Sequence, residues 1–77
     1  MSKKIVVVSA SWCGSCRTLK DLLTRNEVVY HVIDADSDLG MTFCREMGVR
    51  SLPTTFIYED DKIIKTVNGV GKIEEYV

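Results

Sequence analysis

The chain has 77 residues, of which 45% are hydrophobic and 27% charged, and its formal net charge at pH 7 is −1. This length allows one domain with a modest core, and the balanced charge gives no sign of nucleic acid or an anionic membrane as a partner. We therefore expect a single domain over residues 1–77 that binds neither.

The chain opens on a short apolar strand. MSKK has the positive start of a secretory signal, but the apolar run from Ile5 to Val8 is too short for a signal core or a membrane span. Lys4 to Ser9 is rich in β-branched residues and shows no helical period, as expected of a strand buried on both faces. We expect a cytoplasmic protein that begins with this strand.

A helix is predicted from about Gly14 to Arg25, because Leu19, Leu22 and Leu23 recur at helical spacing. A second β-branched run, Val28 to Ile33, follows it. Two strands separated by one helix should be parallel and joined by a right-handed crossover. The CxxC sequence then lies at the carboxyl end of the first strand, the edge where open α/β sheets usually bind their ligands.

The second half of the chain predicts a shorter helix and a hairpin. Asp38 should cap a helix in which Leu39, Phe43 and Met47 recur every four residues, and Gly48 supplies its C-terminal stop. The runs LPTTFIY and KIIKTV are so close together that only a hairpin can join them. A last short helix is predicted in KIEEYV. The expected fold is α/β in the order βαβαββα, with a four-stranded mixed sheet and three helices.

The cysteines carry the clearest chemical signal. Cys13 and Cys16 form a CxxC pair, and Cys44 is a third, odd cysteine. In a reducing cytosol, a CxxC pair near a βαβ unit is more typical of redox chemistry than of a permanent disulfide. Cys13 begins the first helix, where unpaired N–H groups and the helix dipole favour a thiolate. Cys16 lies one turn deeper, so Cys13 is the predicted nucleophile and Cys16 the resolving cysteine.

Two neighbours of the cysteines are candidates for substrate contact. Trp12 directly precedes Cys13; an exposed ring would offer an apolar contact to an extended peptide, and the alternative is that it packs on a neighbouring loop. Pro53 is the only proline and opens a strand. A cis Leu52–Pro53 bond would bring its backbone alongside the cysteines, although only about 5–6% of X–Pro bonds are cis.

These residues resemble a known family. SWCGSC is similar to the thioredoxin active site, in which Trp precedes CGxC, and GVRSLPTTFIY resembles the thioredoxin segment that carries a cis-proline into a strand. VIDAD and Gly69 also match in place, so the resemblance covers nearly the whole chain. It implies a thioredoxin-like fold, protein disulfide oxidoreductase activity and a redox-active pair, Cys13 and Cys16, with Pro53 cis beside it. To the implied substrate groove we assign Trp12, Gly14, Ser15, Leu52, Pro53 and Gly69.

The chain also departs from the thioredoxin pattern. The usual N-terminal strand and helix have no counterpart, which leaves a core of about glutaredoxin size. Val7 and, by our alignment, Tyr30 stand where thioredoxins usually carry a buried Asp and its Lys partner, so the customary proton acceptor for Cys16 is missing. Ser15 replaces the common Pro, and its hydroxyl can donate to a thiolate and favour the reduced form. We therefore predict a reduction potential above the value of about −270 mV typical of thioredoxin.

Other residues carry weaker signals. Cys44 is expected to be a small buried hydrophobe rather than a regulatory thiol. His31 lies in the middle of a strand and is expected to be structural. A zinc site from His31 and the three cysteines would lack a second closely spaced ligand pair, so we expect no metal and no cofactor.

Three aspartates, Asp34, Asp36 and Asp38, imitate the first half of a calcium-binding loop. Leu39 and Arg45 stand where such a loop needs Gly and Glu, so the imitation fails. We expect these aspartates to form a solvated loop and a helix cap.

The favoured function is that of an enzyme, a thiol-disulfide oxidoreductase that reduces protein disulfides through a mixed disulfide on Cys13. A glutaredoxin-like enzyme fed by glutathione is the closest alternative, and a thioredoxin-fold binding module without redox activity is the third. The expected partners are protein disulfides and, as electron donor, thioredoxin reductase or glutathione. We expect a monomer.

Overall fold

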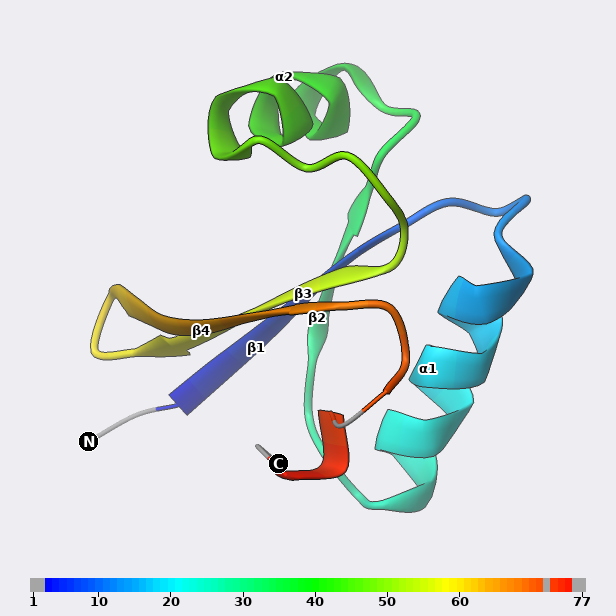
Figure 1. Ribbon diagram of the computed structural model, residues 1–77, viewed down its shortest axis with the longest axis vertical. Helices are drawn as coiled ribbons and strands as arrows, with labels where there is room; N and C mark the ends of the chain where they lie inside the picture. Colours follow the sequence, from blue (N-terminus) through cyan, green and yellow to red (C-terminus); the bar gives the residue numbers. More distant parts are fainter. Residues whose placement is uncertain (1–2, 72, 76–77) are drawn as a thin grey trace.

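The computed structural model describes residues 3–71 and 73–75 as a sheet with helices on both faces (Figure 1). The elements in chain order are β1 (Lys3–Ser9), α1 (Gly14–Arg25), β2 (His31–Asp34), α2 (Asp38–Met47), β3 (Thr54–Glu59), β4 (Lys62–Asn68) and the 3₁₀ helix η1 (Ile73–Glu75). The four-stranded sheet has the order β2-β1-β3-β4. β1 is parallel to β2 and antiparallel to β3, which is antiparallel to β4, so the sheet is mixed, as predicted.

The core lies mainly between the sheet and α1. Figure 1 shows α1 and η1 on one face of the sheet and α2 on the other. Because side chains alternate along a strand, β1 sends Ile5 and Val7 toward α1 and Val6 and Val8 toward α2, and all four are buried. The main cluster of buried apolar side chains consists of Ile5, Val7, Leu19, Leu23, Ile57, Val67 and Ile73.

On the opposite face, α2 approaches the sheet at two points. Gly40 packs so closely on the end of β2 that a Cβ atom would overlap the carbonyl oxygen of Asp34. One turn further, the ring of Phe43 meets Phe56 of β3 edge to face, with centroids 5.6 Å apart. The helix therefore turns the Gly40 and Phe43 side toward the sheet.

This orientation corrects the apolar stripe predicted for α2. Leu39 is 79% exposed and Met47 is 37% exposed, so only Phe43 of the predicted stripe reaches the sheet. The close approach at Gly40 sets the rotation of the helix, and this rotation carries Leu39 away from the sheet. The predicted end of α2 is confirmed, because Gly48 is its C-cap in the left-handed conformation (φ 70°).

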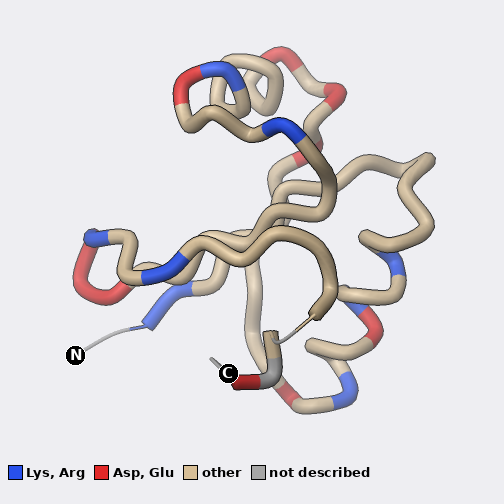
Figure 2. The backbone as a smooth tube through the Cα atoms, viewed as in Figure 1, with Lys and Arg blue, Asp and Glu red and all other residues tan. Residues whose placement is uncertain are grey.

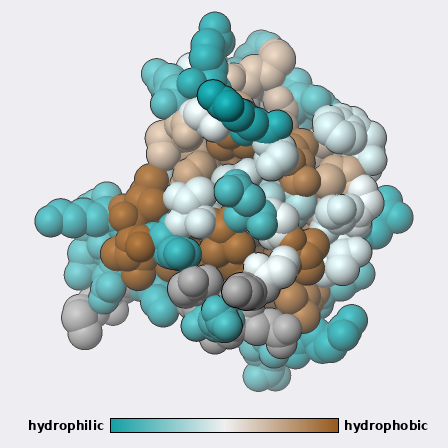
Figure 3. All heavy atoms as spheres, viewed as in Figure 1, coloured by the Kyte–Doolittle hydropathy of each residue, from teal (hydrophilic) through white to brown (hydrophobic). Residues whose placement is uncertain are grey.

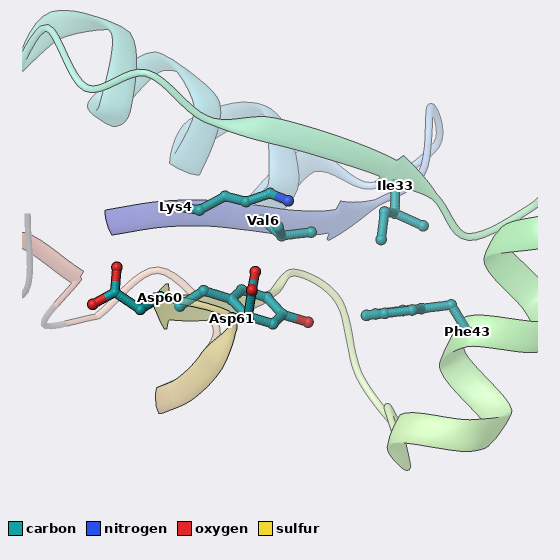
Figure 4. A pocket seen from close by; sticks show the side chains of 7 residues that line it. Lys4, Val6, Ile33, Phe43, Asp60 and Asp61 are labelled. Carbon is teal, nitrogen blue, oxygen red and sulfur yellow. The ribbon is translucent and has the colours of Figure 1, made fainter. Parts of the chain in front are cut away.

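The sheet face beside Phe43 is hollowed. A pocket of about 400 Å³ is lined by Lys4, Val6, Ile33, Phe43, Tyr58, Asp60 and Asp61. In Figure 4 the Phe43 ring reaches into it from α2, and Lys4 and Val6 lie along β1. Figure 3 shows hydrophobic residues at the surface beside the hairpin of β3 and β4. The α2 side of the sheet is thus less completely covered than the α1 side.

Two boundaries differ from the sequence prediction. β2 begins at His31 rather than Val28, because the Val28 N–H donates to the Leu23 carbonyl at 2.9 Å and so belongs to the end of α1. The cap of α2 is Ser37 rather than Asp38, since the Ser37 hydroxyl accepts from a backbone N–H of the first turn at 2.9 Å. Neither difference changes the order of the elements.

The predicted third α-helix in KIEEYV is replaced, within the described residues, by one turn of 3₁₀ helix. Residues 72, 76 and 77 of that segment lie outside the described part. A single turn after Gly71 suffices to seat Ile73, which is fully buried, and 3₁₀ helices are usually this short. Residues 3–71 and 73–75 therefore contain two α-helices rather than three. Over the same residues, no helix combines the length and apolar character needed to cross a membrane.

Candidate active site

The two cysteines of the CxxC pair lie where β1 gives way to α1. The chain turns after β1, and the Cys13 N–H donates to the Ala10 carbonyl at 3.1 Å. Cys13 is the N-cap of α1, with extended backbone angles (φ −93°, ψ 109°). Its side chain therefore lies over the first turn of the helix, where backbone N–H groups lack intrahelical partners.

The side-chain atom that caps the N-terminus of α1 is the sulfur of Cys13. Cys13 Sγ accepts a hydrogen bond from the Cys16 N–H at 3.1 Å, and the two residues are joined by a disulfide with a Cα–Cα distance of 5.3 Å. Cys13 is partly exposed, whereas Cys16 is only 1% exposed. Once the disulfide opens, the N–H donor and the positive end of the helix dipole stabilise a thiolate on Cys13. The outer sulfur is open to another protein, whereas the inner one is shielded from a protein substrate.

The loop that carries the cysteines is uncharged. Figure 2 shows no Lys, Arg, Asp or Glu between the end of β1 and the start of α1. The first charged residue of α1 is the exposed Arg17. The cysteine loop itself therefore places no charged side chain beside the Cys13 sulfur.

Trp12 is both exposed and fixed. The side chain is 69% exposed, and its Nε1 donates to Asp36 Oδ2 at 2.8 Å. Asp36 belongs to the loop between β2 and α2, and its own N–H donates to Asp34 Oδ1 at 2.9 Å. The two alternatives for Trp12 are thus combined, since the ring is open to solvent while its edge is bound to a neighbouring loop. Sequence reasoning placed Asp36 in a solvated loop and missed this contact.

Pro53 and Gly69 lie at the same edge of the sheet as the cysteines, because β3 starts and β4 ends where β1 ends. The Leu52–Pro53 peptide bond is cis. Pro53 is buried and Leu52 partly buried, and the Pro53 carbonyl accepts from the Gly69 N–H at 2.8 Å. Gly69 has φ 77°, a conformation that favours glycine. The loops before β3 and after β4 are therefore bound to each other.

Gly14 and Ser15, between the two cysteines, form the exposed surface of the first turn of α1. A Cβ at Gly14 would meet nothing within 4 Å, so the fold leaves open space over this residue. The small side chains at both positions leave the approach to Cys13 unobstructed.

The strands beneath the cysteines bury the apolar Val7 and Val8 together with the polar Ser9, Thr54 and Thr55. Val7 is fully buried and lies opposite Thr55 of β3 and Val32 of β2. Tyr30, the other position where the chain departs from thioredoxins, is half-buried against the core. Thr55 is fully buried, and its Oγ1 has no hydrogen-bond partner among the described residues. Sequence reasoning did not single out Thr55.

The remaining candidates lie elsewhere. Cys44 is free and half-buried on α2, not fully buried as predicted, because α2 turns a different side toward the sheet. His31 is exposed at the start of β2. In the part of the chain that the structure describes, no three His, Cys, Asp or Glu side chains are grouped so that they could hold a metal ion.

Comparison with known proteins places these features in a family. A family model described as thioredoxin matches residues 1–77. The chain is 33% identical over 73 residues to thioredoxin F2, chloroplastic, of Arabidopsis thaliana, which covers 86% of this chain and 39% of the relative. It is 37% identical over 78 residues to thioredoxin H-type 1 of Nicotiana tabacum, covering 95% of this chain and 62% of the relative. The chain thus spans about half the length of these curated relatives.

Solved structures share the fold. Thioredoxin pre-protein of Schistosoma mansoni superposes with a TM-score of 0.81 at 21% identity, over 96% of this chain and 74% of that one. Thioredoxin f2 of Chlamydomonas reinhardtii gives a TM-score of 0.75 at 16% identity, over 96% of this chain and 71% of that one. Identities this low show a common fold, whereas the match to the family model extends along the sequence. The chain belongs to the thioredoxin family.

Proposed function

We propose that this protein is a thiol-disulfide oxidoreductase that reduces protein disulfides through Cys13 and Cys16. One arrangement carries the proposal: a partly exposed Cys13 Sγ accepts an N–H hydrogen bond at the start of α1, and the resolving sulfur of Cys16 is buried one turn behind it. Membership in the thioredoxin family supports the same activity.

The reaction starts from the reduced pair. The Cys13 thiolate attacks one sulfur of the substrate disulfide, and the other substrate sulfur leaves with the electron pair and takes a proton. Cys16 then loses its proton to water and attacks Cys13 Sγ. The bond between Cys13 and the substrate breaks, the second substrate thiol is released, and the Cys13–Cys16 disulfide forms. Two electrons have then passed from the protein to the substrate.

We propose that the substrate chain lies across the edge of the sheet where the three loops meet. Trp12 offers an exposed apolar face whose orientation is fixed by its hydrogen bond to Asp36. We assign the other side of the groove to Leu52, Pro53 and Gly69, which lie at the same edge of the sheet as the cysteines. The absence of charge from the cysteine loop suits a substrate recognised through its backbone and apolar side chains rather than through ion pairs.

We propose a thioredoxin reductase, rather than glutathione, as the electron donor that opens the Cys13–Cys16 disulfide. In support, the chain is 25% identical over 76 residues to part of NADPH-dependent thioredoxin reductase 3 of Arabidopsis thaliana, covering 94% of this chain and 14% of that protein. A solved complex of ferredoxin:thioredoxin reductase with thioredoxin f2 contains a chain of the same fold, with a TM-score of 0.79 at 24% identity over 97% of this chain and 71% of that one.

Serine variants test the dithiol mechanism. Cys13→Ser should abolish reduction of a protein disulfide such as those of insulin, and Cys16→Ser should accumulate a covalent complex that a reductant releases. Cys44→Ser is the matched control and should keep its activity. If Cys13→Ser reduces the substrate at the wild-type rate, the proposed function is wrong.

A coupled assay tests the donor and both alternative functions. Turnover should be sustained by NADPH with a thioredoxin reductase and should be much slower with glutathione and glutathione reductase. The opposite order would favour the glutaredoxin-like enzyme. A binding module without redox activity would show the same mass after alkylation with and without a reductant, even in a sample first exposed to oxidant.

A further inference from the structure

Thr55 carries a hydroxyl group that the oxidised fold leaves without a partner. Its side chain is fully buried, and Oγ1 makes no hydrogen bond with any described residue. The neighbouring Thr54, which is also buried, donates to the Ser51 carbonyl at 2.7 Å. Buried polar side chains in native proteins are nearly always hydrogen-bonded, so the exception at Thr55 calls for a physical explanation.

The register of the sheet places Thr55 on the α1 face. Thr55 lies opposite Val7 of β1 and Val67 of β4. Both valines belong to the buried cluster that includes Leu19 and Leu23 of α1. Because residues directly opposite each other in an antiparallel pair share a face, the Thr55 side chain is enclosed beneath α1.

Along the sheet, Thr55 lies near the end that carries the cysteines. It stands two residues after Pro53, a displacement of about 7 Å along an extended chain. Cys16 is the first buried residue of α1, and Leu19 follows it one turn further from this edge. Because α1 begins at the end of β1, Cys16 and Thr55 both lie on the α1 face of the sheet, toward the edge that carries the cysteines.

We propose that the Thr55 hydroxyl serves the reduced protein, in which it donates a hydrogen bond to the Cys16 sulfur directly or through one water. The inference rests on the proposed dithiol function. In the oxidised protein the Cys16 sulfur is held in the disulfide and is a weak acceptor. When the disulfide opens, Cys16 becomes a thiol and, in the resolving step, a thiolate, which accepts a stronger hydrogen bond.

This contact has a defined place in the resolving step. Cys16 gives its proton to water, and the resulting thiolate attacks Cys13 Sγ with its electron pair. The bond between Cys13 and the substrate sulfur breaks, and that sulfur leaves with its electron pair and takes a proton from solvent. Thr55 keeps its own proton throughout and loses its sulfur partner when the Cys13–Cys16 disulfide forms. The hydroxyl therefore stabilises the reduced form relative to the oxidised form.

Thr55→Val removes the hydroxyl and keeps the shape of the side chain. We expect its equilibrium with a glutathione redox buffer to shift about twofold to tenfold toward the oxidised protein, as for the loss of one hydrogen bond between neutral groups, because Cys16 is a thiol in the resting reduced protein. A tenfold shift corresponds to a fall of about 30 mV in reduction potential. The pKa of the Cys16 thiol should rise, because its thiolate loses a donor; alkylation against pH in a Cys13→Ser background measures it.

Two matched variants separate this role from a structural one. Thr55→Ser retains the hydroxyl and should keep the wild-type potential. Thr54→Val removes a buried hydroxyl from the opposite face of the sheet and should lower stability without changing the potential. In thermal unfolding, Thr55→Val should stabilise the oxidised protein more than the reduced protein, because only the oxidised form leaves the hydroxyl unpaired.

An unchanged potential, together with equal stabilisation of the oxidised and reduced forms by Thr55→Val, would overturn the inference. Thr55→Ala carries the same test if Thr55→Val does not fold. These measurements need only the Cys13–Cys16 couple and no protein substrate. Their failure is therefore distinct from failure of the proposed function, which the activity of Cys13→Ser decides.

Discussion

The two faces of the sheet are stabilised in different ways. The α1 face holds a continuous cluster of buried side chains to which both α1 and η1 contribute. The α2 face depends on the close approach of Gly40 and on the contact between Phe43 and Phe56, with a pocket of about 400 Å³ beside them. The cysteines belong to the first face. The reactive sulfur is thus positioned by the helix with the more complete core contacts.

The α2 side nevertheless contributes to the site through one loop. Gly40 brings the start of α2 against the backbone of Asp34. The same loop carries Asp36, which accepts the hydrogen bond from Trp12. The tightly packed face thus positions the sulfur atoms, whereas the sparsely packed face orients the aromatic ring of Trp12.

The largest expected effect on stability comes from comparing alanine substitutions of two leucines, one on each helix. Leu19→Ala empties a fully buried position of α1 and should cost about 2–5 kcal/mol of unfolding free energy. Leu39→Ala, at an exposed position of α2, should change it by less than about 0.5 kcal/mol. Urea unfolding of the oxidised proteins, followed by circular dichroism, measures both. Equal losses would show that the two faces do not differ as described.

Gly40→Ala tests the contact that seats α2. Alanine is the better helix former by about 1 kcal/mol, so without a clash the change would stabilise the protein. Because the new Cβ would overlap the Asp34 carbonyl oxygen, we expect instead a loss of about 1–3 kcal/mol. Gly71→Ala is the control, since a Cβ there meets nothing within 4 Å. Increased stability of Gly40→Ala would refute the proposed seating of α2.

Asp36→Ala tests the link between the two sides and should have the smallest effect. Without the hydrogen bond to Asp36, the Trp12 ring loses about 0.5–1.5 kcal/mol of interaction energy that holds it in place. We therefore expect kcat/KM for a protein disulfide to fall roughly twofold to tenfold. Trp12 fluorescence anisotropy should fall as the ring gains freedom. Asp21→Ala, at an exposed site on α1, is the control. If Asp36→Ala keeps the wild-type kcat/KM and anisotropy, Asp36 does not orient the Trp12 ring for substrate binding.

Much of the fold follows from local sequence signals. The bounds of α1 agree with the predicted range from Gly14 to Arg25, because the leucine spacing and the Cys13 cap act within the helix itself. The α2 stripe was wrong for a tertiary reason: the contact at Gly40 decides which side faces the sheet. The start of β2 was misplaced because Val28 to Tyr30 have strand-like composition but precede the pairing that begins at His31.

Some residues of the candidate site could likewise be predicted from the sequence, whereas others could be recognised only in the folded structure. Cys13 and Cys16 were evident from their spacing at the start of a helix. The hydrogen bond from Trp12 to Asp36 joins residues 24 positions apart, so only the folded structure reveals it. The unpaired hydroxyl of Thr55 also has no sequence signature, since Thr is common in strands and only the register encloses it beneath α1. The reduction potential inferred from Ser15 stays a prediction.

The central claim is that the start of α1 ionises the Cys13 thiol, and the most direct test is its titration. A Cys16→Ser/Cys44→Ser double variant leaves one reactive thiol and keeps the backbone N–H that Cys13 Sγ accepts from. The rate of alkylation against pH should give a pKa for Cys13 clearly below the value of about 8.5 for an ordinary cysteine. A midpoint at or above that value would contradict the account.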